Sequence, residues 1–219
     1  MEFINELQNG GVIMYPLLLG SILALAIVIE RAFCLRKKNV LVAEIVSAIG
    51  KIESVEDIKV AERICEANPG PFANIVLVAL NNRDLVIDEL KDAILDQGRQ
   101  EIRTLERGIV ALETIAAAAP LLGLMGTVLG MIKVFNVISE QGIGQASVLS
   151  GGISEALITT VTGLAVGIPA LVAYNFLTNK AESLVLDIEK YSSGLLRNIR
   201  AMKARAVRSG STGGGTEAD

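Results

Sequence analysis

The chain has 219 residues, 51% of them hydrophobic, and a mean hydropathy of +0.51. This composition argues against a simple soluble protein and makes membrane insertion the first hypothesis. The sequence contains no histidine, which excludes His-dependent catalytic triads, His-ligated zinc and haem bound through His, while the net charge of −4 says little about partners.

Three long apolar segments cover residues 12–29, 114–132 and 156–179. Each is close to the roughly 20 apolar residues needed to cross a hydrocarbon core, and none contains a charged residue. The residues before the first segment carry Glu2 and Glu6 but no Lys or Arg, the reverse of a signal peptide, so we expect this span to be retained. We therefore predict an all-α integral membrane protein with three transmembrane helices.

The placement of basic residues predicts the orientation of these helices. Of the 20 Lys and Arg residues, 19 lie on one side of the three spans. The exception is Lys133, near the far end of the second span, where it can snorkel to the interface. Since Lys and Arg accumulate in cytoplasmic loops, we expect the N-terminus outside the cytoplasm and the C-terminus inside it.

The resulting organisation alternates spans with outer and cytoplasmic segments. In residue numbers, we expect an outer N-terminal segment 1–11, a transmembrane helix 12–30, a cytoplasmic helical region 31–107, a transmembrane helix 108–138, an outer link 139–152, a transmembrane helix 153–179, a cytoplasmic helical extension 180–208 and a disordered tail 209–219.

The cytoplasmic region is predicted to be helical, with clear breaks. Ser54 followed by Asp57 resembles a capping box, and the segment 68–71, Asn-Pro-Gly-Pro, is the strongest break. From about residue 84 an apolar stripe continues without an obvious breaker, which predicts one helix over about 84–137. The third helix is expected to continue as an amphipathic stretch through Ile199.

Cys34 and Cys65, the only two cysteines, fit neither a disulfide framework nor a metal knuckle. We expect no metal site, no cofactor and no nucleic-acid partner. The sequence also lacks a phosphate-binding loop of the GxxxxGK[ST] type and a nucleophile elbow, so an enzyme is not expected.

Small residues form one face of the second span. Ala116, Pro120, Gly123 and Thr127 share this face, and Gly126 and Gly130 form a small-xxx-small pair. In lipid, where there is no hydrophobic drive between helices, close packing of small residues is what joins them. We expect this narrow, partly polar face to point inward.

The third span repeats the pattern, because Glu155, Thr159 and Gly163 cluster on one side with Thr160 and Gly167 beside them. Pro169 is expected to bend the helix by removing a hydrogen bond.

Two interpretations of these polar residues stay open. Threonines in such a face can simply bond the carbonyl one turn back. Glu155 can mark an ion pathway within the membrane edge, or it can lie at the outer interface near the start of its helix.

These residues resemble the ExbB/TolQ proton-channel family, which is related to the MotA stator proteins. The resemblance covers nearly the whole membrane portion. It is carried by Glu30-Arg31 at the end of the first span, by residues 119–128 (APLLGLMGTV), by residues 152–160 (GISEALITT), by Gly163-Leu and Ile168-Pro-Ala in the third span, and by Tyr174-Asn175.

The resemblance implies a ring, a homopentamer whose pore holds the single helices of two ExbD- or TolR-like partners. An aspartate on the partner helix would carry the proton, facing Thr127 and Thr160, while Glu155 matches the membrane glutamate of the family. Thr159 is included among the expected pore-lining residues. None of the three spans contains an aspartate, which agrees with a proton carrier on the partner.

The implied function is that of a subunit in a motor of the bacterial inner membrane that uses the proton motive force. It would couple proton flow to work on the cell envelope through a TonB- or TolA-like protein. The alternative from another class is a scaffold that assembles an envelope complex in the bilayer without conducting ions.

Overall fold

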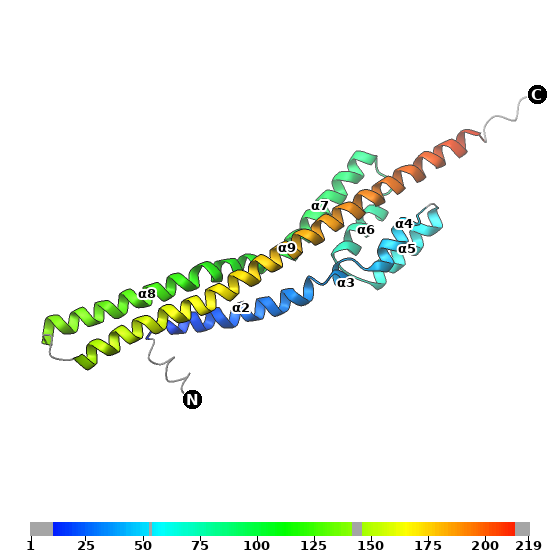
Figure 1. Cartoon of the computed structure of the whole chain (residues 1–219). Coiled ribbons are helices and arrows are strands. Elements are labelled where there is room, and N and C mark those ends of the chain that lie inside the picture. The colour runs from blue at the N-terminus through cyan, green and yellow to red at the C-terminus, as the bar shows by residue number, and fades with distance from the viewer. Residues whose placement is uncertain (1–10, 53, 142–145, 213–219) are drawn as a thin grey trace, which may run out of the picture. The chain divides into compact units, whose positions relative to one another are not determined.

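A computed structural model describes residues 11–52, 54–141 and 146–212 of the chain, and its regular elements in this range are all helices. The prediction of an all-α fold is therefore confirmed. In chain order (Figure 1), they are α2 Met14–Cys34, α3 Lys37–Val40, α4 Ala43–Gly50, α5 Val55–Ala67, α6 Pro71–Asn81, α7 Ile87–Glu106, α8 Ile109–Gln141 and α9 Ala146–Thr212.

Helices α2, α8 and α9 are long and apolar enough to cross a membrane. Each contributes an 18-residue window with a mean hydropathy of at least 2.0. The prediction of three membrane-spanning helices is confirmed in this sense. Where the bilayer begins and ends along them stays a prediction.

The described chain divides into two compact units, of which the first contains most of α2, all of α8 and the first half of α9. In this unit α8 and α9 form an antiparallel hairpin whose backbones meet at small residues. A Cβ added at Gly163 would lie 2.6 Å from the carbonyl oxygen of Ala119, and one added at Gly130 would lie 2.9 Å from the Cβ of Ala156. Real Cβ atoms do not approach other atoms this closely, so only glycine fits at these positions.

Helix α2 packs onto this hairpin near the N-terminal end of the described chain. Met14 and Leu17 are buried there against Ala119, with Ile158 and Val166 of α9 packed around them. This cluster is apolar throughout, as expected for helices that pack within a hydrocarbon layer.

The second unit contains α3 to α7 and the C-terminal half of α9. Phe72 of α6 is fully buried, with its ring centroid 6.0 Å from that of Tyr191 on α9. The amide of Asn198 donates to the carbonyl of Ile49 at 2.9 Å, tying α4 to α9. Leu195 and Ile199 are buried along the same helix, so its amphipathic continuation is confirmed.

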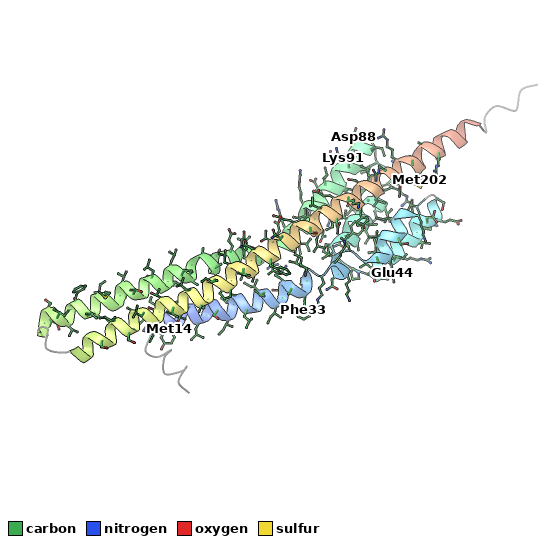
Figure 2. All side chains as sticks on the ribbon, in the orientation of Figure 1. Met14, Phe33, Glu44, Asp88, Lys91 and Met202 are labelled. Atoms are coloured by element: carbon green, nitrogen blue, oxygen red, sulfur yellow. The ribbon has the colours of Figure 1, made fainter. Side chains whose placement is uncertain are left out.

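Two predicted breaks in this unit are also confirmed. Ser54 and Asp57 form the capping box at the start of α5, and Pro71 is at the first turn of α6. Figure 2 shows the side chains of the surface residues Glu44 on α4 and Asp88 and Lys91 on α7.

The prediction of one uninterrupted helix over about 84–137 is wrong. Helix α7 ends at Glu106 and α8 begins at Ile109, with a turn at Arg107 and Gly108 between them. Gly108 has φ +87°, a left-handed conformation that glycine adopts without steric cost. A Cβ there would lie 3.4 Å from Nε of Arg31, so the turn also passes close to α2.

Other boundaries differ in smaller ways. Helix α9 extends to Thr212, so residues 209–212 are helical although a disordered tail was expected from 209. Residues 1–10 of the expected outer segment, 142–145 of the outer link and 213–219 of the tail lie outside the described residues. Pro169 lies within α9 without ending it, and the bend expected there stays a prediction.

The contact between α8 and α9 predicts a large difference between two glycine substitutions on the same helix. Gly163→Ala should lower the thermal stability of the detergent-solubilised protein, because overpacking typically costs about 1–3 kcal/mol and here the added Cβ meets backbone. Gly151→Ala is the matched control, since nothing lies within 4 Å of a Cβ at that position. Stability is measured as the temperature at which half of the protein is lost from its size-exclusion peak. Equal losses in both variants would contradict the packing described.

The buried thiol of Cys65 predicts a pH-dependent labelling rate. Burial is the main cause that raises the pKa of Cys65 to about 11, with smaller contributions from Glu62 and Glu66, because all three disfavour the thiolate. In a Cys34→Ser variant, about one molecule in 1,000 carries a Cys65 thiolate at pH 8, so reaction with a maleimide should be slow and should accelerate about tenfold per pH unit. The same variant unfolded in detergent is the control. A folded protein that is labelled as fast as the unfolded one at pH 8 would show that the thiol is not protected.

Candidate functional site

The hydroxyl groups of Thr127 on α8 and Thr160 on α9 are hydrogen-bonded to each other across the hairpin. Both side chains are half-buried. The Thr127 hydroxyl is also 3.2 Å from the carbonyl oxygen of Ala156, and the Thr160 hydroxyl is 3.3 Å from that of Gly123. Since a hydroxyl donates one hydrogen bond and accepts others, each threonine has acceptors available on both helices.

This pair depends on the glycine contacts next to it. A Cβ at Gly123 would lie 3.2 Å from the Cα of Thr160 and 2.9 Å from the carbonyl oxygen of Thr159. The missing side chain at Gly123 therefore lets α8 come close enough for the two hydroxyls to meet. Gly167 allows the same approach about two turns beyond Thr160 on α9, where a Cβ would lie 2.6 Å from Cδ of Pro120.

Thr159 occupies a different environment from its neighbour Thr160. Its side chain is only 1% exposed, and its hydroxyl donates to the carbonyl of Ala156 at 2.8 Å. It packs against Gly126, where an added Cβ would overlap it. The structure thus places Thr159 inside the contact between the helices, and its part in a proton pathway stays a prediction.

Glu155 is the tenth residue of α9, in its third turn, and forms an ion pair with Lys133 of α8. The Lys133 Nζ and Glu155 Oε1 atoms are 2.6 Å apart. The Glu155 side chain is 22% exposed and that of Lys133 is 59% exposed. The carboxylate also packs against the backbone at Gly11, where a Cβ would lie 3.2 Å from Cδ of Glu155.

Sequence reasoning did not pair Lys133 with Glu155. It treated Lys133 as a lone cation at the far end of its span. The pair depends on the register of the hairpin, because Gly130 opposite Ala156 brings Lys133 level with the third turn of α9. The sequence of either span alone does not set that register, so no local signal predicts the pair.

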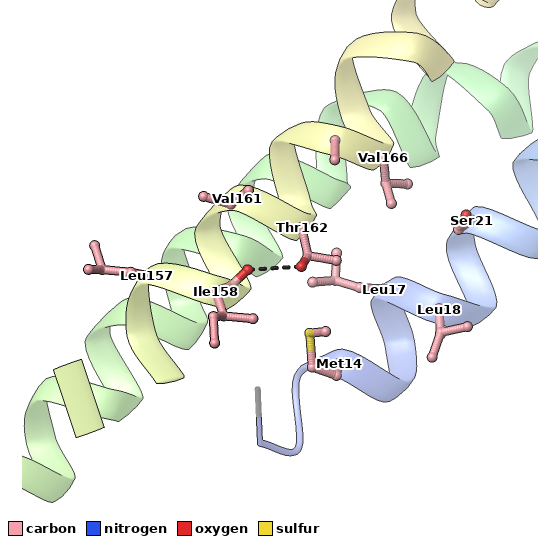
Figure 3. A pocket seen from close by; sticks show the side chains of 10 residues that line it. Met14, Leu17, Leu18, Ser21, Leu157, Ile158, Val161, Thr162 and Val166 are labelled. Carbon is pink, nitrogen blue, oxygen red and sulfur yellow. Dashed lines mark hydrogen bonds between the residues drawn. The ribbon is translucent and has the colours of Figure 1, made fainter. Parts of the chain in front are cut away.

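A groove of about 610 Å³ lies between α2 and α9 (Figure 3). Met14 and Leu18 line one side, and Leu157 and Val161 line the other. Thr162 faces this groove, with its hydroxyl donating to the carbonyl of Ile158 at 2.8 Å. Among the described residues, no ionisable side chain lines this groove.

Metal chemistry has no support in the described residues. No cluster of three or more Cys, Asp or Glu side chains is placed to hold an ion there, and the sequence has no histidine. The distinctive chemistry of the hairpin is therefore a hydroxyl pair in an apolar span and an ion pair closer to the end of α8 and the beginning of α9.

Comparison with known proteins identifies the family. The model of the MotA/TolQ/ExbB proton channel family matches residues 67–190. This range contains α6, α7, α8 and α9 as far as residue 190. The chain belongs to this family. The earlier resemblance to ExbB/TolQ proteins is thereby confirmed, and the chain is a multi-pass membrane protein of the ExbB type.

Relatives of this chain carry ExbB names in distant organisms. The biopolymer transport protein ExbB-like 1 of Synechocystis sp. is 37% identical over 186 residues, or 81% of this chain and 71% of that protein. An ExbB homolog of Methanothermobacter thermautotrophicus is 31% identical over 185 residues, covering 83% of this chain and 65% of its own. ExbB of Aquifex aeolicus is 35% identical over 119 residues, with 54% and 80% covered.

Proposed function

We propose that this protein is the ring-forming subunit of a motor in the bacterial inner membrane that is driven by the proton motive force. Five copies would surround the single helices of an ExbD- or TolR-like partner dimer and couple proton flow to mechanical work through a TonB- or TolA-like protein. The observation that carries this proposal is the hydroxyl pair of Thr127 and Thr160, in a chain of the proton channel family.

Chemistry divides the task between this chain and its partner. A threonine hydroxyl can relay a proton or position water, but it cannot store charge at neutral pH. The likeness to the family assigns the group that stores the proton to an aspartate on the partner helix, which agrees with the lack of an aspartate in the spans of this chain. One proton that crosses 100 mV releases about 2.3 kcal/mol, which is enough to drive a conformational step.

The half-buried state of both threonines supports a role beyond packing. A threonine needed only to fill space could be fully enclosed, as Thr159 is. Thr127 and Thr160 instead remain partly accessible. A partner helix beside them could therefore contact both hydroxyls, whereas a scaffold without conduction would not require an accessible polar pair.

We also propose that the second unit lies in the cytoplasm and the link between α8 and α9 in the periplasm. The support is the charge distribution, with 19 of 20 basic residues on the side of the second unit.

Removing either hydroxyl should stop proton flow without preventing assembly. In proteoliposomes that contain the complex with its partner, Thr127→Val and Thr160→Val should each lower the proton flux by about tenfold or more, because a positioned proton-transfer group is lost while the shape is kept. Flux is followed with a pH-sensitive dye under an imposed membrane potential. Thr162→Val is the matched control, since Thr162 lines the apolar groove and its hydroxyl donates to the carbonyl of Ile158 on its own helix. Normal flux in both test variants, together with envelope work that survives collapse of the proton gradient, would support the scaffold instead.

The orientation predicts opposite labelling of two surface positions. In a Cys34→Ser, Cys65→Ala background, Lys59→Cys on α5 should react with a membrane-impermeant maleimide only in inverted vesicles. Glu140→Cys at the end of α8 should react only from the periplasmic side. Both native side chains are exposed in the described structure, so lack of reaction reports the membrane barrier. Labelling of Lys59→Cys in intact spheroplasts would contradict the proposed orientation and indicate the opposite one.

A further inference from the structure

The Glu155 carboxylate is enclosed by three segments of the chain. Lys133 reaches it from α8, the backbone at Gly11 closes it from the segment before α2, and α9 carries it. Gly11 has φ +68° and passes so close that an added Cβ would overlap Oε1 of Glu155. The Glu155 side chain has three rotatable bonds, and these contacts hold its carboxylate between Lys133 and Gly11.

The same carboxylate faces an open pocket of about 400 Å³. Val134 and Val137 of α8 and Gly152 of α9 line it together with Asn136, Lys133 and Glu155. Because a water molecule takes about 30 Å³ in the liquid, the pocket has room for several. Glu155 therefore lies where solvent from the outer end of the hairpin can meet an ionisable group.

Lys133 is the one cation within this arrangement, among the residues the structure describes there. It is the exception to the charge distribution of the whole chain, because all other basic residues lie on the opposite side of the spans. A surface ion pair in water typically adds less than about 1 kcal/mol to stability. Lys133 therefore contributes little to the pairing of α8 and α9. The glycine contacts already join α8 and α9 along their length.

We infer that Lys133 is a positioning residue that holds the Glu155 carboxylate at the mouth of this pocket. The inference rests on the proposed function, because it assigns Lys133 a role in the proton pathway to which Glu155 is assigned. Lys133 orients the carboxylate through the 2.6 Å contact and does not itself transfer the proton. Displacement of a reacting group by about 1 Å can cost about 100-fold in rate, so the loss of this contact should be visible in the flux.

The test compares three Lys133 variants in proteoliposomes that contain the complex with its partner. Lys133→Met should lower the proton flux about tenfold or more, with unchanged thermal stability and size-exclusion elution. Lys133→Arg keeps a donor of the same charge and should stay within about twofold of the unchanged protein. Equal flux in the Met variant and the unchanged protein would overturn the inference, as would a flux loss matched by lost stability.

A charge swap separates positioning from helix pairing. Lys133→Glu combined with Glu155→Lys keeps an ion pair between α8 and α9 but moves the carboxylate to the other helix. If the pair only joins the helices, the swap restores flux and the inference is wrong. If Lys133 positions the carboxylate on α9, the swapped protein keeps its stability while its flux stays low.

Glu155→Gln and Thr127→Val distinguish failure of this inference from failure of the proposed function. Loss of flux in both, with normal flux in Lys133→Met, refutes only the role of Lys133. Normal flux in Glu155→Gln and Thr127→Val refutes the proton pathway and the role of Lys133 with it.

Discussion

The close approach of α8 and α9 is the contact on which the other features of the membrane unit depend. Gly123, Gly130, Gly163 and Gly167 each lack a Cβ where one would collide with the facing helix. In lipid the hydrocarbon chains compete equally well for apolar side chains, so only close packing favours the contact between helices. The glycines thus determine both the distance between the helices and the register in which they meet.

That register has chemical consequences at two depths. It brings the hydroxyls of Thr127 and Thr160 into contact. Closer to the end of α8 and the beginning of α9 it brings Lys133 to Glu155, where an ammonium and a carboxylate meet at 2.6 Å. A shift of α9 by one turn would move Thr160 and Glu155 by about 5.4 Å relative to α8 and would separate the two threonine hydroxyls. Packing and the candidate proton pathway are therefore one structural arrangement and not two.

Gly108 shows that a single residue can change how the whole chain is organised. Its left-handed conformation ends the continuous helix that the apolar stripe predicted, and it separates α7 from α8 at the junction between the two compact units. An isolated glycine is tolerated within many helices, so periodicity could not reveal this break. What distinguishes Gly108 is the close contact of the turn with Arg31 on α2, which belongs to the tertiary structure.

The sequence by itself determined the three apolar helices, the capping box at Ser54 and the break before Pro71, because length, hydropathy and local hydrogen bonding are properties of contiguous residues. It also carried the family motifs around Thr127 and Glu155. Only the tertiary structure decided that Thr159 is enclosed while Thr160 is paired, and that Lys133 meets Glu155. These outcomes depend on the rotation and register of one helix against another, which residues far apart in sequence establish together and no local pattern encodes.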